Sequence, residues 1–198
     1  MSAAIPDFKD PFDLFGRWLD EAIAQEPDVP NAMSLATATA AGRPSVRMVL
    51  LKGVSDGGFV FYTNAESRKG VEIAQNPHGA LCFHWKTLGR QVRAEGPMSE
   101  VTAAEADAYH ATRPRQSQIA AWASAQSRAI AGRAELENKV AEMEKRFAGQ
   151  PVPRPPFWTG YRLHPLSIEF WFNVANRLHD RLVFERDGTG WRAHRLNP

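Results

Sequence analysis

"SVRMVLLKGVSDGGFVFYTN", residues 45–64, decides the expected architecture. Two runs rich in Val, Leu and Phe, residues 45–54 and 59–64, flank the polar stretch "SDGG" (55–58). β-Branched and aromatic residues are typical of strands, and Asp-Gly between two such runs indicates a tight hairpin turn. A hairpin joins antiparallel strands. We therefore expect residues 45–54 and 59–64 to pair as antiparallel neighbours.

Further strands and helices are expected on both sides of this hairpin. Regular alternation of strand and helix is missing, and turn signals such as "DGTG" (187–190) join strands directly. This order argues for an α+β fold, an antiparallel sheet or small barrel with added helices, and against a doubly wound parallel sheet. The other expected strands are 31–39, 79–85, 90–101 and four within 159–197 ("TGYRLHP", "SIEFWFN", "RLHDRLVFER" and "GWRAHRLN"), and the expected helices are 12–26, 67–77, 102–112, 114–124 and 133–148.

Three of the expected helices begin with recognisable cap signals. Asp10 can cap the first helix, because Pro11 then occupies its first turn, and Ser67 can cap the second. Thr102 and Glu105 have the spacing of a capping box at the start of the third. These signals set helix starts that the structure can test directly.

Composition bounds the class of protein. The chain has 198 residues, 43% of them hydrophobic, which is enough for the core of one domain, and we interpret Trp122 and Trp158 as part of this core. We expect a single domain over 1–198 with a flexible N-terminus over 1–10. A net charge of +2, one cysteine (Cys82) and histidines without ligand spacing argue against a nucleic-acid surface, a disulfide framework and a metal site. With no signal peptide or long apolar segment in the sequence, we expect a soluble, cytoplasmic protein that does not bind membranes.

The first candidate site surrounds the start of the second expected helix. A helix N-terminus presents free N–H groups and a partial positive charge, and Arg68 and Lys69 add full charges. The hairpin places Tyr62, Thr63 and the stretch 47–52 nearby. This combination favours a phosphate site, although a solvated basic helix start is the simpler interpretation. Neither GxGxxG nor GxxxxGK[ST] occurs, so dinucleotide and P-loop motifs do not apply.

The second candidate site is "YHATRPRQS", residues 109–117. Pro114 disfavours helix at Arg113 and suits the first turn of the next helix. Tyr109, Arg113 and Ser117 are therefore expected around a helix start, where a second phosphate-sized anion can be held. Arginines beside proline-started helices are common, so this pattern is weak by itself.

The third candidate site is "NRLHDRLVF", residues 176–184. If this segment is a strand, Arg177, His179 and Arg181 share one face, because alternate side chains point the same way. Three such groups side by side are unfavourable unless an anion lies against them. The alternative is a surface strand whose charges are balanced by neighbouring acidic residues.

In combination, these stretches resemble the pyridoxamine 5′-phosphate oxidase family of FMN enzymes. The resemblance extends from "DPFDLF" (10–15) to "RLNP" (195–198), and "IEFWFNVANRLHDR" (168–181) looks like the family signature. "RMVLLKG", "VFYTNAESRKG", "RQVRAEG", "ATRPRQSQIAAWASAQS" and "PPFWTGYRL" occur in family order. The family implies an FMN-binding split β-barrel, mostly antiparallel with peripheral helices, that forms a homodimer with FMN at the subunit interface.

The resemblance also implies a reaction and a set of residues. Pyridoxamine or pyridoxine 5′-phosphate is oxidised to pyridoxal 5′-phosphate while O2 is reduced to H2O2, and we hypothesise that hydride passes from substrate C4′ to flavin N5. Arg177 and His179 would face the substrate near its reacting carbon as catalytic residues. The residues implied to hold the substrate phosphate are Lys52, Tyr109, Arg113 and Ser117. The residues implied to bind FMN are Arg47, Met48, Val49, Leu50, Leu51, Lys52, Tyr62, Thr63, Arg68, Lys69, Gln91, Gln126, Ser127, Trp171 and Arg181.

Two other functions are consistent with the same sequence. A related split-barrel FMN oxidase, of the phenazine-biosynthesis type, would use the same flavin site for another substrate. A non-catalytic module would bind flavin or pyridoxal phosphate without turnover.

The N-terminal region also departs from the family, whose members often carry a longer arm that closes over the substrate. Only nine residues precede "DPFDLF", without an Arg-x-x-Tyr, so we expect an absent or different lid.

Overall fold

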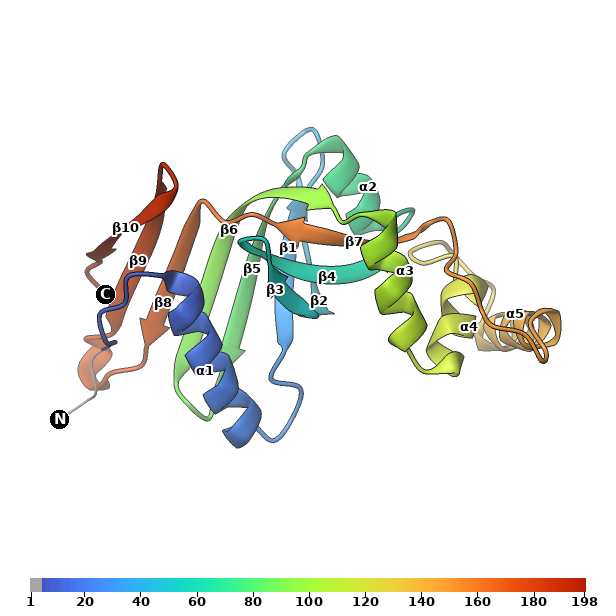
Figure 1. Cartoon of the computed structure of the whole chain (residues 1–198), viewed down its shortest axis with the longest axis horizontal. Coiled ribbons are helices and arrows are strands. Elements are labelled where there is room, and N and C mark those ends of the chain that lie inside the picture. The colour runs from blue at the N-terminus through green and yellow to red at the C-terminus, as the bar shows by residue number, and fades with distance from the viewer. Residues whose placement is uncertain (1–4) are drawn as a thin grey trace.

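The computed structural model describes residues 5–198, which form a curled antiparallel sheet with helices around it (Figure 1). Seven strands follow the order β10-β9-β8-β6-β5-β1-β2, and β7, β4 and β3 continue the sheet from the far end of β6. The predicted α+β fold is confirmed. The strands are β1 (Ala32–Ala38), β2 (Pro44–Leu50), β3 (Gly53–Ser55), β4 (Gly58–Asn64), β5 (His78–Trp85), β6 (Arg90–Glu100), β7 (Trp158–Leu163), β8 (Ser167–Phe172), β9 (Asp180–Asp187) and β10 (Gly190–Arg195).

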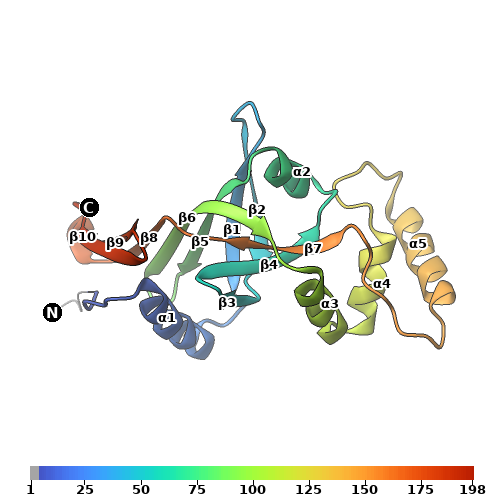
Figure 2. The ribbon, with the colours of Figure 1, turned by 45° about the horizontal axis from the view of Figure 1, so that its top comes forward.

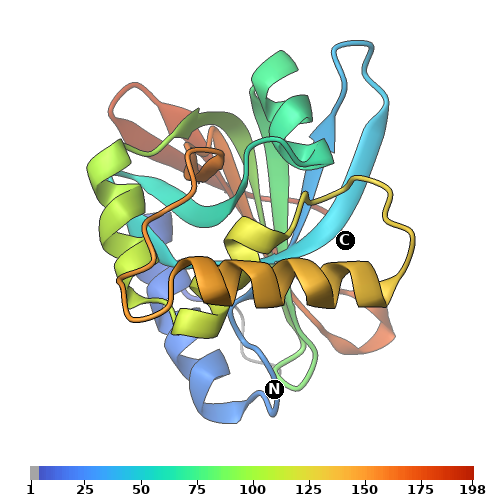
Figure 3. The same ribbon diagram turned by 90° about the vertical axis from the view of Figure 1, so that its right-hand side faces the viewer.

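The helices are distributed unevenly around the sheet. α1 lies across one face, α2 lies near the ends of β1 and β2, and α3, α4 and α5 lie on the side remote from β10 (Figures 1 and 2). Seen from that side, α5 is the outermost element (Figure 3). No helix within residues 5–198 is long and apolar enough to cross a membrane. The helices are α1 (Pro11–Gln25), α2 (Arg68–Gln75), α3 (Ala103–Thr112), α4 (Arg115–Ala123), α5 (Arg133–Arg146) and the short 3-10 helix η1 (Ala175–Arg177).

The predicted hairpin exists, but its first strand is divided in two. β3 pairs with β4 through the turn at Asp56 and Gly57, which both have positive φ, whereas β2 pairs with β1. The division falls between Leu51, whose N–H donates to Asn31 O, and Lys52, whose N–H donates to Val60 O. The expectation of one continuous strand over 45–54 was therefore wrong, because an apolar run does not reveal where a strand changes partner. This bend brings Lys52 to the junction of two parts of the sheet.

The predicted cap signals are confirmed. The Asp10 side chain accepts a hydrogen bond from Phe12 N, and the Ser67 side chain accepts one from Gly70 N. The capping box of α3 is complete, with Thr102 and Glu105 bonding each other's backbone N–H groups. Local sequence thus sets where these helices begin, because the caps satisfy N–H groups that the helix leaves free.

The core lies between α1 and the sheet. The Phe15 ring of α1 packs 4.9 Å from the ring of Phe59 on β4 and 5.0 Å from that of Phe83 on β5, measured between centroids. Trp18 packs edge-on against Phe170 of β8. Burying such aromatic side chains supplies much of the free energy that fixes α1 against the sheet.

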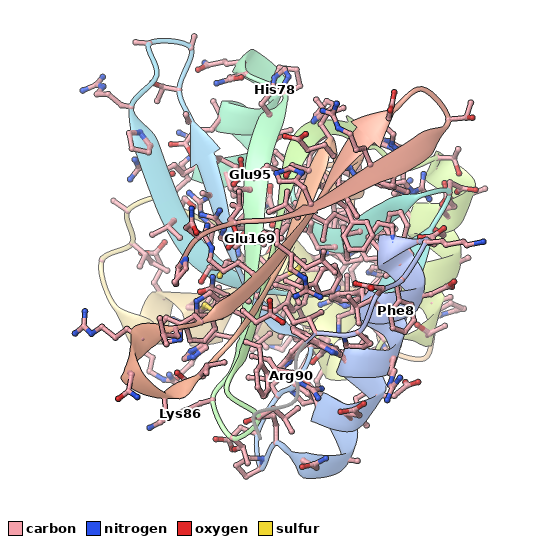
Figure 4. The ribbon with its side chains drawn as sticks, turned by 90° about the vertical axis from the view of Figure 1, so that its left-hand side faces the viewer. Phe8, His78, Lys86, Arg90, Glu95 and Glu169 are labelled. Carbon is pink, nitrogen blue, oxygen red and sulfur yellow. The ribbon has the colours of Figure 1, made fainter. Side chains whose placement is uncertain are left out.

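The opposite face of the sheet is open in this chain. Along β2, side chains alternate between half-buried and exposed, and Val46 and Met48 are 68% and 61% exposed. Met48, Ser34 and Cys82 are cross-strand neighbours on this face, and the same row continues through β6 to Glu169 of β8. Figure 4 labels Glu95 and Glu169 on this sheet, together with Phe8 beside α1. Exposed apolar side chains on one strand, such as Val46 and Met48, are typical of an interaction surface.

The described part of the N-terminus is held against the last strands. Ile5 is 2% exposed, and its N–H donates to Asp180 at 2.6 Å. Arg195 donates to Ile5 O at 2.8 Å and also pairs with Asp180 and Asp7. Within the segment 1–10 that is expected to be flexible, Ile5 and Asp7 thus contact residues of β9 and β10, and residues 1–4 lie outside the described residues.

Replacing a core aromatic residue tests this account of the fold. Phe83→Ala should lower the free energy of unfolding by about 3–5 kcal/mol, because it removes buried area and leaves a cavity between α1 and the sheet. Chemical denaturation measures this change. Leu166→Ala is the control, since Leu166 is 55% exposed and its loss should cost within about 0.5 kcal/mol. Equal effects of the two substitutions would contradict this location of the core.

Candidate functional site

A cleft of about 460 Å³ opens where β2, β4, α2 and α3 meet. The bend after β2 and the helix starts position its walls, so residues far apart in sequence face one space. Most of its lining residues were predicted from sequence to bind FMN or a substrate phosphate. They are Met48, Val49, Leu50, Lys52, Tyr62, Thr63, Lys69, Tyr109, Arg113, Ser117 and Gln126, joined by Thr112, Pro114 and Trp158.

Lys69 is a buried cation without an acidic partner. Its Nζ donates to Thr63 Oγ1, Ser67 Oγ and Gln126 Oε1, each at 3.0 Å, and it is 7% exposed. No carboxylate of residues 5–198 forms an ion pair with it. Burial, together with the positive charge of Arg47, lowers the pKa of Lys69 to about 8. A buried ammonium with only neutral partners fits an anionic ligand, which would replace the lost solvation.

A second cation lies at the other side of the cleft, on an aromatic platform. The rings of Tyr62, Tyr109 and Trp158 are nearly parallel, and the Arg113 guanidinium lies 4.8 Å from the Trp158 ring centroid. Arg113 Nη1 is buried and has no hydrogen-bond partner in the described chain. Burial lowers the pKa of Arg113. Lys52 lies nearby, 6.0 Å from the Tyr109 ring centroid. A buried, unpaired guanidinium nitrogen favours a hydrogen-bond acceptor, and a phosphate has the matching geometry.

Arg47 and Arg68 converge on a single carboxylate beside the cleft. Glu72 of α2 accepts from Arg68 Nε at 2.8 Å and from Arg47 Nη2 at 3.4 Å. Arg47 therefore points toward α2 and does not line the cleft. Arg68 and Ser127 line a second cavity of about 600 Å³, and each directly follows or precedes in sequence a residue that lines the first cavity, Lys69 or Gln126. Ser127 has a positive φ of 71°. Leu51, also in the predicted set, is a buried core residue at the bend after β2.

The remaining predicted residues form a separate group on β6, β8 and β9. Gln91, Trp171 and Arg181 are cross-strand neighbours in one row of the open face. The His179 ring lies 4.5 Å from the Trp171 ring centroid, and its Nδ1 accepts from Val174 N. Arg181 donates to Glu169 at 2.8 Å.

The expected single strand through Arg177, His179 and Arg181 was wrong. β9 begins only at Asp180, and Arg177 lies in η1, where Asn176 and Arg177 have positive φ values of 58° and 61°. Alternate spacing does not place Arg177 on the face of Arg181, because the backbone turns between them. The turn instead leaves Arg177 exposed beside His179.

The two groups do not meet within one chain. Four strand spacings separate β2 from β8 in the order of the sheet. At about 4.8 Å per spacing, this places them roughly 19 Å apart along the sheet. The cleft and the row of Gln91, Trp171 and Arg181 therefore lie on separate parts of the sheet of one chain.

The sequence analysis missed residues that hold the predicted site residues in place. Trp158 was interpreted as a core residue, and it is buried, yet it also lines the cleft and supports Arg113. Glu72 and Glu169 each pair with two arginines. A glutamate four residues after Arg68 on a helix was the one available signal for Glu72. The pairing of Glu169 with Arg93 depends on strand register, which the sequence does not display.

Comparisons with known proteins agree with this geometry. The family model described as pyridoxamine 5′-phosphate oxidase matches residues 19–147. The chain belongs to this family. A second model, described as the pyridoxine 5′-phosphate oxidase C-terminal dimerisation region, matches residues 158–198. That match covers β7 to β10, including the strands that carry Trp171 and Arg181, and indicates that family members pair as homodimers.

Relatives and solved structures support the family over nearly the whole chain. A pyridoxine/pyridoxamine 5′-phosphate oxidase of Rhodospirillum rubrum is 58% identical over 96% of this chain and 97% of its own. One of Sphingopyxis alaskensis is 59% identical over 100% of this chain and 91% of its own. The crystal structure of PhzG from Burkholderia lata, in complex with tetrahydrophenazine-1-carboxylic acid, has a TM-score of 0.91 and 34% identity, covering 96% and 94% of the two chains. An FMN-binding protein of Nostoc punctiforme shares the fold, with a TM-score of 0.77 and 16% identity over 98% of this chain and 100% of its own. The predicted split-barrel fold is thereby confirmed.

The buried charge of Lys69 should appear in the pH dependence of stability. An unfolded lysine titrates near its ordinary value of about 10.4, so the unfolded chain binds more protons than the folded chain above pH 8. The charged form thus destabilises the fold below pH 8, and this cost disappears as pH rises. The free energy of unfolding of the ligand-free wild type, relative to Lys69→Met, should rise by roughly 1–3 kcal/mol between pH 8 and 10.

Denaturant titrations of both proteins across this pH range measure the difference. Lys86→Met is the control, because Lys86 is exposed and its removal should leave the pH dependence of the wild type unchanged. A constant difference between wild type and Lys69→Met from pH 8 to 10 would show that Lys69 titrates normally.

Proposed function

We propose that this chain oxidises pyridoxine 5′-phosphate and pyridoxamine 5′-phosphate to pyridoxal 5′-phosphate, with FMN as cofactor and O2 reduced to H2O2. The observation that carries the proposal is the presence of two cations without acidic partners that face one cleft: the buried Lys69, and the half-buried Arg113, whose Nη1 is buried and unpaired in the described chain. A flavin phosphate and a substrate phosphate are two anions that suit them. The names of relatives at 58% and 59% identity support the same reaction.

The residues around Lys69 fit the phosphate of FMN. Arg47, Arg68 and Lys69 carry three positive charges and Glu72 one negative charge, so the cluster has a net charge of +2. A phosphate monoester carries about −1.5 to −2 charges at pH 7. Thr63 and Gln126 supply neutral hydrogen-bonding groups to the same place. The charge of the cluster is therefore matched by one bound phosphate.

The residues around Arg113 fit the phosphate of the substrate. Arg113 offers an unpaired Nη1, and Lys52 is the second cation of this part of the cleft. Tyr109 and Ser117 line the same wall and add hydroxyl groups. Stacking of Arg113 on Trp158 holds the guanidinium in one orientation, which reduces the entropy lost when an anion binds.

The chain's own groups would orient the substrate and exclude water. FMN, when bound, supplies a two-electron acceptor that O2 can reoxidise. Arg177 carries a positive charge on an exposed turn, and the His179 ring packs against the Trp171 ring. We propose that both contact the pyridine ring of the substrate and hold its reacting carbon in place, and that Arg177 stabilises negative charge on the ring oxygen.

We propose further that two copies of the chain complete each site, with FMN at their interface. The cleft and the row of Gln91, Trp171 and Arg181 lie at distant strands of one sheet. Both border the open face with its exposed Val46 and Met48. A second copy packed on this face would bury the exposed Val46 and Met48. It would also bring the partner's row of Gln91, Trp171 and Arg181 to the cleft of the first chain.

A second function is an oxidase of the same fold that acts on another substrate. The similarity to PhzG, at a TM-score of 0.91, favours it specifically. The higher identity of the pyridoxine/pyridoxamine 5′-phosphate oxidases, at 58% and 59%, and the cations and hydroxyls around Arg113 favour a phosphorylated pyridine instead.

Peroxide release tests these assignments directly. The purified chain, supplied with FMN, should release H2O2 with pyridoxine or pyridoxamine 5′-phosphate. Unphosphorylated pyridoxine should react with kcat/KM at least about 100-fold lower, because it lacks the charge-assisted contacts to Arg113. Turnover of tetrahydrophenazine-1-carboxylic acid alone would indicate the second function, and flavin binding without any peroxide would indicate a non-catalytic module.

The Arg177→Leu substitution tests whether Arg177 orients the substrate without contributing to FMN binding. Turnover of pyridoxine 5′-phosphate should fall roughly 100-fold, because a positive charge beside the substrate is lost. The dissociation constant of FMN, measured by flavin fluorescence, should change less than about threefold. Arg192→Leu removes an exposed arginine from β10 and serves as the control. Full turnover by Arg177→Leu would exclude the proposed role.

A further inference from the structure

Glu72 is the most heavily bonded carboxylate beside the site. It lies in α2 and is 3% exposed. Its Oε2 accepts from Thr37 Oγ1 of β1 and Ser45 Oγ of β2, each at 2.5 Å, and its Oε1 accepts from Arg68 Nε at 2.8 Å. Burial raises the pKa of Glu72, but the hydrogen bonds from Ser45, Thr37 and Arg68 outweigh this effect and lower it to about 2. The group is therefore a fixed negative charge at neutral pH.

The contact with Glu72 leaves the outer end of Arg68 available. Arg68 uses Nε for Glu72, and neither Nη1 nor Nη2 has a hydrogen-bond partner among residues 5–198. The side chain is 62% exposed and lines the 600 Å³ cavity. A guanidinium held through Nε keeps its two Nη groups as a planar pair of donors, which is the arrangement that binds phosphate in a bidentate manner.

Arg47 is held from the other side of the same carboxylate. Its Nη2 lies 3.4 Å from Glu72 Oε2, and its Nη1 donates to Leu35 O and Thr37 Oγ1. Burial, and to a smaller extent the charge of Arg68, lowers the pKa of Arg47 against the attraction of Glu72. Like charges this close repel each other, so a carboxylate between them is needed to hold both arginines.

We propose that Glu72 is a positioning residue for the phosphate end of FMN: it holds Arg68 through Nε and Arg47 through Nη2, so that Arg68 presents both Nη groups to the cavity. The inference rests on the proposed function, because it assumes that FMN is the ligand. A purely electrostatic role would have the opposite sign, since a negative charge beside a phosphate weakens its binding. A purely structural role would affect folding without affecting the choice of ligand.

The ratio of the dissociation constants of riboflavin and FMN isolates the phosphate contribution. The two ligands share the ring and ribityl chain and differ in the phosphate. Each ratio would be measured by fluorescence titration of the full-length chain after removal of flavin. Wild type should prefer FMN, and Glu72→Gln should lower this preference about tenfold, the equivalent of one charge-assisted hydrogen bond. Its affinity for riboflavin should stay within about threefold of wild type, which also reports that the variant is folded.

Four further variants make the test specific. Glu66→Gln removes the same charge from the same cavity, and Glu66 forms no ion pair in the described chain, so its FMN preference should stay equal to or above that of wild type. Arg68→Ala should lower the preference by itself, and adding Glu72→Gln to it should lower the preference by less than Glu72→Gln does in wild type, because Glu72 acts mainly through Arg68 and only its contact with Arg47 is left. If Glu72→Gln does not fold, Glu72→Asp replaces it, since it keeps the charge but shortens the reach to Arg68, and the same loss is expected.

The outcomes separate this inference from the function on which it rests. A wild-type chain that binds FMN no better than riboflavin overturns the phosphate site and the inference together. A wild type that prefers FMN, with an equal or higher preference in the Glu72 variants, overturns the inference alone. Independent, additive losses from the changes at positions 68 and 72 overturn it as well.

Discussion

Buried positive charge without internal compensation is the constraint on which the site depends. Lys69 is buried and the Nη1 atom of the half-buried Arg113 is removed from water, yet neither residue has a carboxylate partner in the described chain. Desolvation of a cation is costly unless an anion or several acceptors replace water. The ligand-free fold therefore holds two places where an anion would be stabilising. A chain of nearly neutral net charge can thus still contain local sites suited to anions.

The curled sheet places the two groups of predicted site residues on distant strands. β2 ends at the cleft, whereas Trp171 and Arg181 lie on β8 and β9. β2 and β8 lie four spacings apart along the sheet, so within one chain the two groups of residues are held separately. The open face and the match to a dimerisation region over residues 158–198 give a consistent explanation. In this architecture the surface that pairs two chains would also be the surface that assembles the site.

Two buried glutamates each hold a pair of arginines in place, one beside the cleft and one on β8. Glu72 pairs with Arg47 and Arg68, and Glu169 pairs with Arg93 and Arg181. In each case one carboxylate is shared between two guanidinium groups, so each cluster keeps a net positive charge. Such an arrangement restrains the arginines without neutralising them, which is what an anion-binding site requires.

The sequence by itself determined the helix starts, the antiparallel class and the family. Asp10, Ser67 and Thr102 cap their helices as expected, because capping depends on residues a few positions apart. Motif order was enough to recognise the family, since residues that contact a shared ligand type recur in the same order along the chain. These are local or linear properties, and they need no knowledge of the tertiary packing.

Only the tertiary structure decided which of those residues face one another. The break between β2 and β3, the turn that removes Arg177 from β9, and the support of Arg113 by Trp158 all depend on contacts between distant segments. So does the pairing of Glu169 with Arg93, which follows from strand register. The physical reason is that these contacts are fixed by the burial and hydrogen bonding of the whole sheet, whereas sequence patterns report only the preferences of neighbouring residues.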